Sequence, residues 1–356
     1  MSGVTIYDVA AQAGVSIKSV SRVLNGEPNV SDALRAKVEA AVDALGYRPS
    51  LSARGLAGAS SYLIAALVDA DLTVEHWRSG RGNDYLSRME LGALMECRHA
   101  GYHLMIELVD VNSPGVEREI QAMVSSLRPA GLILTPPVSD CRLVLDVLDR
   151  RGSHYVRLGS EIQLGRGRRV YMDDHRAAYD MTMHLAGLGH RDIGFIIGSA
   201  RYAASQSRRE GFVSAMAHQG LEVRPEWILE GDFTFQSGLE CGARMLAQTQ
   251  RPTAIFASND DMAFGVLQAA VRQGLSVPAE LSVVGFDDAP GAQFTTPQLT
   301  TVRQPVAEMA EMAARMLIAI AQAKSDEAVE RTHQAAYVLV ARESSAPPSP
   351  RPAQNI

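Results

Sequence analysis

The sequence predicts a two-part protein, an all-α headpiece followed by a larger α/β core. Three short helical patterns with capping residues fall within the first fifty residues. From about residue 60, short apolar runs alternate with longer helical stretches, which is typical of βαβ units and parallel sheets. A length of 356 residues leaves room for two or three domains.

Residues 5–25 read TIYDVAAQAGVSIKSVSRVLN and predict two short helices around a glycine turn. Thr5 is a suitable N-cap for a first helix over Ile6–Ala13. Gly14 supplies the left-handed backbone of a tight turn, and Ser16 caps the second helix. Apolar spacing predicts a shared inner face made of Val9, Ala10, Val15, Val20, Val23 and Leu24.

The opposite face of the second helix carries Ile17, Lys18, Ser21 and Arg22. An apolar back and a front with hydrogen-bond donors and one small apolar side chain are what a DNA-recognition helix requires. Lys18 and Arg22 would donate to bases or phosphates, and Ile17 would contact a thymine methyl group. The alternative is a helical hairpin on the surface of an enzyme, because a single such pattern is only moderately specific.

A third helix is predicted within residues 30–49, where Ser31 is the N-cap and Gly46 ends the helix. Three short helices of this kind form a small bundle that can serve as a DNA-binding headpiece. The following segment, LSARGLAG at 51–58, is too short to be a stable helix alone.

Seven apolar runs beyond residue 60 read as strands with helical segments between most of them. About ten strands in all are too many for one compact layer, so the pattern indicates two parallel sheets. The seven runs are Tyr62–Val68, His103–Val109, Ala130–Thr135, His154–Leu158, Asp192–Ile197, Thr253–Ala257 and Leu281–Phe286.

The charge is unevenly distributed along the chain. The formal net charge is -6, yet residues 1–60 hold six Lys and Arg against five acids. A near-neutral headpiece on an acidic body suits site-specific DNA binding better than general polyanion binding. No run is long and apolar enough to span a membrane, and the N-terminus lacks a signal pattern, so we expect a cytoplasmic, nucleoid-associated protein.

Catalytic, metal and cofactor chemistry is not expected. The chain has three widely spaced cysteines, interpreted as reduced thiols, and lacks nucleophile-elbow, Walker, dinucleotide and HExxH motifs. The paired acids at 173–174, 260–261 and 287–288 could indicate an enzyme. We favour pairs at strand ends, where one acid accepts sugar hydroxyls and its neighbour caps a helix.

The motifs, taken together, resemble the lactose-repressor/galactose-repressor (LacI/GalR) family of bacterial transcription regulators. The resemblance rests on TIYDVAAQAGVSIKSVSRVLN, the SxARGLAG stretch, GLGHRDIGF from Gly187, SNDDMAFG from Ser258, SVVGFDD from Ser282 and LTTVRQ from Leu299. These blocks follow the family order and cover roughly residues 4 to 342. The missing signal and the headpiece oppose an exported sugar-binding protein.

The resemblance implies a periplasmic-binding-protein-like core, in which two Rossmann-like subdomains are joined by three crossovers around a ligand cleft. The expected organisation is a headpiece (1–49), a hinge (50–59), a ligand-binding and dimerisation core (60–342) and a disordered proline-rich tail (343–356). The tail carries no leucine heptad, so we expect a dimer rather than a tetramer. The partners are then a palindromic operator in double-stranded DNA, a small effector and a second copy of the chain.

Family residues carry over to five cleft positions. Arg208 in SRREGF would bridge ligand hydroxyls, and Asn259 in SND and Asp287 in GFDD would bind opposite edges of a sugar. Phe233 in GDF would stack on a sugar ring, and Gln304 in TVRQ lies near a crossover. The structural alternatives are helix capping or surface solvation, and core packing for Phe233.

Arg157, near the end of a predicted strand, is a sixth candidate effector residue. Beside Arg208 it would favour a ligand with a carboxylate, because two guanidinium groups exceed what a neutral sugar needs. The alternative is that Arg157 pairs with a nearby acid such as Asp71 or Glu161 and only shapes the pocket.

The DNA-binding residues come from the headpiece and the hinge. Ser16, Ser21 and Asn25 would fix the register on phosphates, and family hinge helices would insert Leu56 into the minor groove. The full set is Thr5, Tyr7, Ser16, Ile17, Lys18, Ser19, Ser21, Arg22, Asn25, Ala53, Arg54 and Leu56. The expected function is a repressor of carbohydrate-utilisation genes controlled by a sugar or sugar derivative. Corepression, activation and a non-sugar effector remain open.

Overall fold

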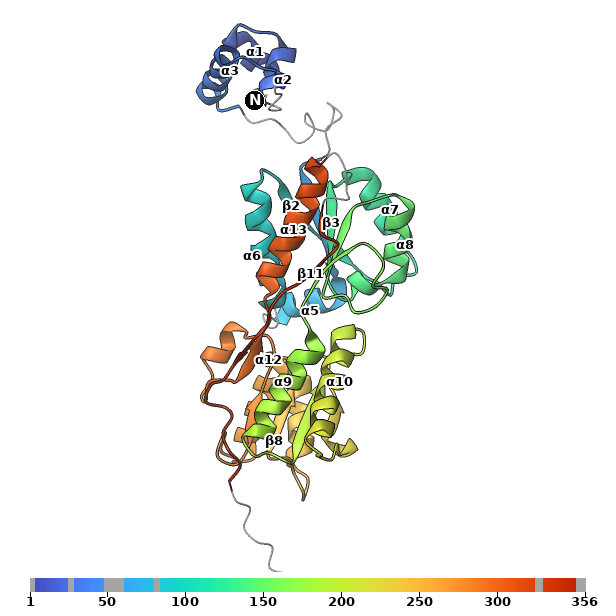
Figure 1. Ribbon diagram of the computed structural model, residues 1–356, viewed down its shortest axis with the longest axis vertical. Coiled ribbons are helices and arrows are strands. Elements are labelled where there is room, and N and C mark those ends of the chain that lie inside the picture. Colours follow the sequence, from blue (N-terminus) through green and yellow to red (C-terminus); the bar gives the residue numbers. More distant parts are fainter. Residues whose placement is uncertain (1–3, 25–28, 48–60, 80–83, 324–328, 350–356) are drawn as a thin grey trace, which may run out of the picture. The chain divides into compact units, whose positions relative to one another are not determined.

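The computed structural model describes residues 4–24, 29–47, 61–79, 84–323 and 329–349 (Figure 1). The chain divides into two compact units, which meet in the sequence between Tyr62 and Leu63. Across the described residues, no helix combines the length and apolar composition needed to cross a membrane.

The first unit contains three helices whose ends follow local sequence signals. They are α1 (Ile6–Ala13), α2 (Ile17–Leu24) and α3 (Asp32–Leu45). The Ser31 hydroxyl accepts a hydrogen bond from the Leu34 amide, and Gly14 and Gly46 adopt left-handed φ values of 63° and 59°. The bounds of α1 confirm the predicted first helix, Ser31 caps α3 as predicted, and both glycines adopt the expected left-handed conformation.

The apolar sides of these helices form one small core. Its buried members include four of the six predicted inner-face residues, and Val15 and Leu24 pack against it while partly buried. The buried set is Val9, Ala10, Val20, Val23, Val38, Ala41 and Tyr47.

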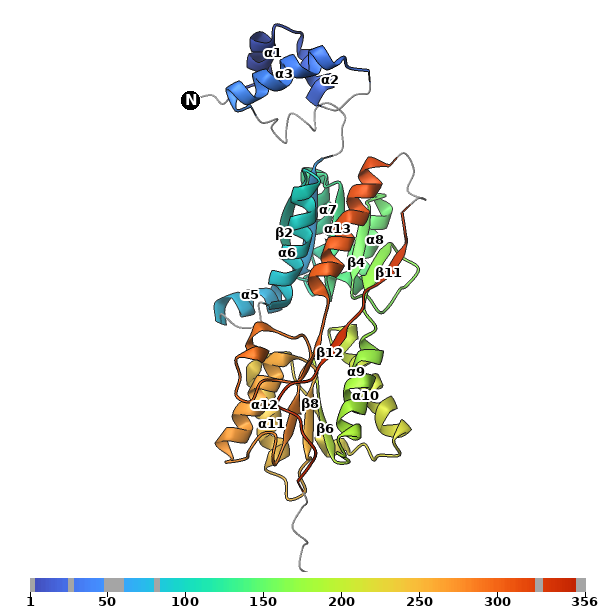
Figure 2. The ribbon, with the colours of Figure 1, turned by 60° about the vertical axis from the view of Figure 1, so that its left-hand side comes forward.

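The second unit is built from two subdomains, each with a parallel sheet between helices (Figures 1 and 2). The sheet of the first subdomain has the strand order β11-β5-β4-β3-β1-β2. Helices α6 and α13 pack together on one face, and α7 and α8 on the other. The elements are β1 (Leu63–Asp69), α5 (Ala70–Ser79), α6 (Asp84–His99), β2 (His103–Val109), α7 (Val116–Leu127), β3 (Gly131–Leu134), α8 (Arg142–Arg150), β4 (Tyr155–Leu158), β5 (Arg168–Tyr171), α13 (Val306–Gln322) and β11 (Thr332–Gln334).

The sheet of the second subdomain has the order β7-β6-β8-β9. Helices α9 and α10 pack together, as do α11 and α12, and the two pairs lie on opposite sides of the sheet. The elements are α9 (Asp174–Gly187), β6 (Ile193–Ile197), α10 (Ala203–His218), β7 (Ile228–Glu230), α11 (Phe235–Leu246), β8 (Ala254–Ala257), α12 (Asp260–Arg272) and β9 (Ser282–Val284).

The chain passes between the subdomains three times, which confirms the expected architecture. It leaves the first subdomain after β5, returns through β10 (Thr301–Arg303) into α13, and leaves again between β11 and β12 (Val338–Val340). Strands β10 and β12 pair antiparallel and bring two of these connections side by side. All seven predicted strands are present, and the two sheets are parallel as expected.

The expectation of disorder from residue 343 onward is wrong for residues 343–349. Ser344 is fully buried, and its hydroxyl donates to the Val283 carbonyl at 2.6 Å. His190 contacts the Ala346 carbonyl at 2.9 Å. The polar partners of this segment, Val283 in β9 and His190 in the loop before β6, are distant in the sequence, and its proline content gave no sign of them. Residues 350–356 lie outside the described residues.

Candidate functional site

A cavity of about 160 Å³ lies between the two subdomains of the second unit. It sits at the carboxyl ends of strands in both sheets, where open parallel sheets bind ligands. Its polar lining comes from both subdomains and consists of Asp69, Thr73, Asp84, Tyr85, Thr135, Asp174, Tyr202, Arg208, Asn259, Asp261, Asp287 and Gln304.

Five of the six predicted effector residues line this cavity, namely Arg208, Phe233, Asn259, Asp287 and Gln304. They are separated by up to 96 positions in the sequence, and the fold brings them to one place. Arg157 is not among the lining residues.

Arg208 projects from α10 and is almost fully buried. Its Nε donates to Asp174 at 2.7 Å, and one terminal nitrogen donates to the Ser258 carbonyl at 2.6 Å. The guanidinium also lies over the ring of Phe286, 3.7 Å from its centre. Among the described residues its second terminal nitrogen has no hydrogen-bond partner, so that group can donate to a ligand.

Asp287 follows β9 with an unusual backbone φ of 128°. Such a conformation is strained for a residue other than glycine and is often found at functional sites. The side-chain amide of Gln304 donates to its carboxylate. Burial raises the pKa of Asp287 to about 7, although Arg208 and the Gln304 hydrogen bond act in the opposite direction.

Asn259 and Phe233 have structural roles in addition to lining the cavity. The Asn259 side chain caps α12 by accepting from the Met262 amide and donates to the Phe233 carbonyl, at 3.0 Å each. Phe233 has a positive φ of 73° and packs edge-on against Tyr202, with ring centres 5.4 Å apart. Its ring lies so close to the backbone of Gly198 that a side chain there would collide with it.

The three acid pairs only partly follow the expected division of roles. One acid of each pair lines the cavity, as predicted: Asp174, Asp261 and Asp287. Asp173 caps α9 by accepting from the Arg176 amide at 2.8 Å, but the other two neighbours cap no helix. They belong instead to the polar network described next.

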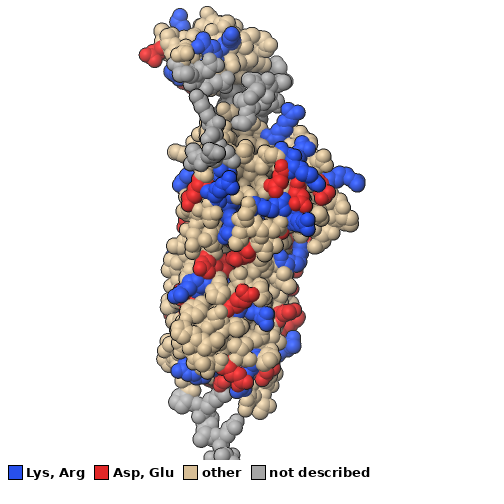
Figure 3. Space-filling model, turned by 45° about the vertical axis from the view of Figure 1, so that its right-hand side comes forward, with Lys and Arg blue, Asp and Glu red and all other residues tan. Residues whose placement is uncertain are grey.

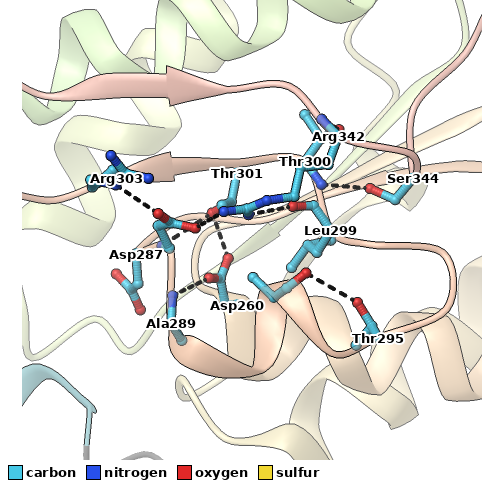
Figure 4. Close-up of polar contacts among 12 residues, drawn as sticks. Asp260, Asp287, Ala289, Thr295, Leu299, Thr300, Thr301, Arg303, Arg342 and Ser344 are labelled. Atoms are coloured by element: carbon cyan, nitrogen blue, oxygen red, sulfur yellow. Dashed lines mark hydrogen bonds and ion pairs between the residues drawn. The ribbon is translucent and has the colours of Figure 1, made fainter.

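Asp260 and Asp288 bind residues in the segments that cross between the subdomains, and Figure 4 shows Asp260 next to Thr301 and Ala289. Asp260 accepts from the Thr301 hydroxyl at 2.6 Å and from the Ala289 amide at 2.7 Å. Asp288 accepts from Arg303 at 2.7 Å and also from Arg342. Burial favours neutral Asp288, but the hydrogen bonds and charges of both arginines outweigh it and hold its pKa below the ordinary value.

The placement of Arg157 in the effector site is wrong. Its side chain is fully buried, and its guanidinium is enclosed by protein oxygens rather than directed at the cavity. It pairs with Asp140 at 2.6 Å, not with Asp71 or Glu161, which were the acids expected. It also donates to four backbone carbonyls, of Ser139, Ile162, Gln163 and Arg166, at 2.6 to 3.3 Å.

Several cavity residues were not identified from the sequence. Asp69 is the last residue of β1, and Asp84 and Tyr85 begin α6. Tyr202 and Thr135 carry polar groups that only the fold brings to the cavity. The position of Asp69 at the end of a strand was the one available sequence signal.

Two arginines connect the subdomains on either side of the cavity. Arg201, from the loop before α10, donates to Asp69 at 2.9 Å and to Asp71 at 3.2 Å. Arg88, on α6, donates to the Asp287 carbonyl at 2.8 Å and to the Asp288 carbonyl. The same guanidinium pairs with Asp84 at 2.7 Å. These contacts hold the cavity closed.

The headpiece presents the predicted face of α2. Ile17 is 40% exposed and Lys18 is also exposed, whereas Ser21 and Arg22 are half-buried. Arg22 donates to the Asn29 carbonyl at 2.8 Å, and Ser16 caps α2 through the Ser19 amide at 3.1 Å.

Only some of the remaining residues predicted to contact DNA lie in the described part of the chain. Thr5 and Tyr7 are exposed, with Tyr7 at 68%. The amide of Thr5 donates to Asp8 at 2.7 Å. Asn25, Ala53, Arg54 and Leu56 lie outside the described residues. No group of three or more His, Cys, Asp or Glu that could hold a metal ion occurs in the part of the chain that the structure describes.

A three-helix headpiece with a helix-turn-helix, followed by a two-subdomain core with a cavity, defines a class of ligand-responsive DNA-binding regulators. A model of the lacI family of bacterial regulatory proteins matches residues 5–50, and a model of the periplasmic binding protein-like domain matches residues 182–345. The HTH-type transcriptional regulator GalS of Salmonella typhimurium is 35% identical over 348 residues, covering 96% of this chain and 97% of the relative. The chain therefore belongs to the lacI family and is a DNA-binding transcriptional regulator.

Solved structures with the same organisation cover nearly the whole chain. The lac repressor dimer bound to operator and the anti-inducer ONPF has a TM-score of 0.81 and 27% identity, over 97% of this chain and 100% of that one. The complex of the transcriptional regulator CelR with cellobiose has a TM-score of 0.72 and 26% identity, over 96% of this chain and 100% of that one.

Proposed function

We propose that this protein represses carbohydrate-utilisation genes and that a small sugar in the cavity controls its affinity for an operator. The observation that carries the proposal is the cavity between the subdomains, in which Arg208 and Asp287 face one ligand-sized space. A guanidinium donor and a carboxylate acceptor match the two hydrogen-bonding roles of a sugar hydroxyl, and Phe233 adds an aromatic surface. The relatives include a lac repressor and a cellobiose-bound regulator.

The DNA contacts are assigned to the exposed face of α2 and to the hinge. Lys18 and Arg22 supply cations for phosphates or base edges, and Ile17 supplies an apolar contact. Thr5, Tyr7, Ser16, Ser19, Ser21 and Asn25 would contact the phosphate backbone. Ala53, Arg54 and Leu56 complete the proposal as hinge residues, with Leu56 as a minor-groove wedge.

We propose a homodimer whose interface includes the outer face of α6. Leu91, Leu94 and Met95, spaced as i, i+3 and i+4, are 57%, 49% and 55% exposed. Leu108 on the edge strand β2, which packs against α6, is 38% exposed. A second copy is the expected occupant, because one headpiece offers too few contacts for tight specific binding.

The proposal gives the protein no catalytic role and assigns it to the cytoplasm, at the nucleoid. Asp174, Asp260 and Asp288 already have hydrogen-bond partners in the cavity wall and its supporting network. A DNA-binding regulator acts where the chromosome lies.

Selection of duplexes from a random pool by the full chain tests the DNA-binding part. We expect enrichment of an inverted repeat, bound specifically in gel-shift titrations. Arg22→Ala should relax the preference at one position of each half-site, and Leu56→Ala should weaken specific more than non-specific binding. Ser113→Ala, a surface change in the core, is the control. Enrichment of no sequence, or equal binding of selected and scrambled duplexes, contradicts the proposal.

A further inference from the structure

The cavity contains more acidic than basic side chains. Among the described residues that line it, Arg208 is the one with a cationic side chain. Five lining residues carry carboxylates: Asp69, Asp84, Asp174, Asp261 and Asp287. The acidic side chains in the lining therefore outnumber the basic ones by five to one, without the arginines that lie outside the lining.

The arginines at the cavity already form ion pairs with three of these acids. Arg208 pairs with Asp174 at 2.7 Å, so its charge is neutralised within the cavity wall. Arg201 pairs with Asp69 at 2.9 Å and also with Asp71, and Arg88 pairs with Asp84 at 2.7 Å. These arginines supply no excess positive charge for an anionic ligand.

In the described part of the chain no arginine bonds to the side chain of Asp287, although the charge of Arg208 partly offsets its negative charge. Its carboxylate accepts from the neutral amide of Gln304, while Arg88 bonds to its backbone carbonyl rather than its side chain. The carboxylates of Asp84 and Asp261 are near enough to disfavour its ionisation, and they act together with burial to raise its pKa to about 7. Besides the Gln304 amide, this carboxylate can accept from a further hydrogen-bond donor, neutral or cationic, on a ligand.

The size of the cavity limits the ligand as well. Its volume of about 160 Å³ lies below the roughly 300–1,000 Å³ that is typical of small-molecule sites, which favours a ligand of a single ring.

We propose that the effector is a single-ring polyhydroxylated compound that is uncharged or carries an amine, and that sugar acids and sugar phosphates are excluded. This inference rests on the proposed effector role of the cavity and narrows the effector's chemical class. A hydroxyl or ammonium group donates to Asp287, and Arg208 donates its remaining N–H groups to a hydroxyl oxygen. An anionic group has no unpaired cation to meet and is repelled by the carboxylates.

Matched sugar sets test the charge rule on the full chain. Each set holds one ring in four forms: neutral sugar, 2-amino sugar, uronic acid and 6-phosphate, in the gluco, galacto and manno series. We expect the neutral or amino member of at least one set to raise the melting temperature. Calorimetry should show its acid and phosphate counterparts binding at least about 100-fold more weakly.

Charge variants separate electrostatic exclusion from poor fit. Asp287→Asn should reduce the preference for the neutral or amino sugar over its uronic acid by about 10-fold or more. Glu240→Gln, which removes an equal charge from the exposed side of α11, should leave that ratio unchanged. An unchanged ratio in Asp287→Asn overturns the proposed exclusion.

Binding of an acid or phosphate as tightly as its neutral counterpart also overturns the inference, while leaving the proposed regulator function intact. If no member of any set binds, the inference and the carbohydrate part of the proposed function both fail. Operator selection then shows whether DNA binding itself stands.

Discussion

The guanidinium of Arg88 in one subdomain donates a 2.8 Å hydrogen bond to the backbone carbonyl of Asp287 in the other. The side chain of Asp287 lines the cavity, and α6, which carries Arg88, also carries the exposed residues Leu91, Leu94 and Met95. One helix thus connects the closed cavity to the proposed subunit interface. This connection is a physical route by which ligand binding can alter the arrangement of the dimer.

Replacing Arg88 with Ala should weaken sugar binding about 10-fold, because closure loses its hydrogen bonds to the carbonyls of residues 287 and 288. Arg88→Lys should lie between Ala and wild type, since a lysine retains the charge but not the two-pronged geometry. Calorimetry with the most stabilising sugar is the measurement, and Arg98→Ala, at the exposed end of α6, is the control. Wild-type affinity in Arg88→Ala would show that the contact plays no part in closure.

Asp287→Asn should make the unliganded protein more stable at pH 8, by roughly 2–4 °C in melting temperature. Burial raises the pKa of Asp287 to about 7, above its value of about 3.9 in an unfolded chain. The folded protein therefore holds this proton more tightly, and the stability it contributes is lost as the pH rises from 4 through 7. The gap between variant and wild type should accordingly widen from pH 5 to pH 8 in thermal melts. A difference in melting temperature that does not change with pH would show that the ionisation of Asp287 is not its cause.

Asp288→Asn should lower the free energy of unfolding by roughly 3 kcal/mol at pH 7, because it leaves Arg342 without its buried carboxylate partner. The pKa of Asp288 is held below its ordinary value, so its contribution is present above about pH 4 and lost as the pH falls further. Urea titrations at pH 7 and pH 3.5 measure both effects. Asp146→Asn, which breaks a surface ion pair with Arg166, should cost less than about 1 kcal/mol. Equal losses for the two variants would contradict the role given to the crossover network.

Leu94→Glu should shift the chain from dimer to monomer, raising the dimer dissociation constant at least about 10-fold, because it places a charge in the proposed apolar interface. Sedimentation equilibrium of the full chain measures the shift, with circular dichroism to establish that the fold is retained. Leu127→Glu, on the part-exposed end of α7, should remain dimeric. A dimeric Leu94→Glu would show that copies associate through another face.

Local signals explain what could be predicted from the sequence. Thr5, Gly14, Ser31 and Gly46 determine where the headpiece helices begin, turn and end, because caps act within a few residues. The long apolar runs of the core likewise identified the seven central strands. Short strands such as β5, whose four residues include two arginines, were missed, because neighbouring strands rather than their own composition stabilise them.

The site was predictable where a family motif names a residue and uncertain where distant segments meet. Asp287 and Arg208 were found from such motifs, whereas Asp69 and Asp84 reach the cavity through contacts that the sequence does not display. Arg157 was misassigned for the same reason: the carbonyl oxygens that surround it belong mainly to a loop folded over its strand. The position of a charged residue at a strand end does not show whether its side chain binds a ligand or other groups of the protein.

The most direct test of the central claim is the affinity of the full chain for its selected operator, measured by fluorescence anisotropy with and without the saturating sugar. We predict that the sugar changes the dissociation constant at least about 10-fold in wild type, typical of an allosteric coupling of this kind. An operator affinity that is the same with and without a sugar shown by calorimetry to occupy the cavity would contradict the account.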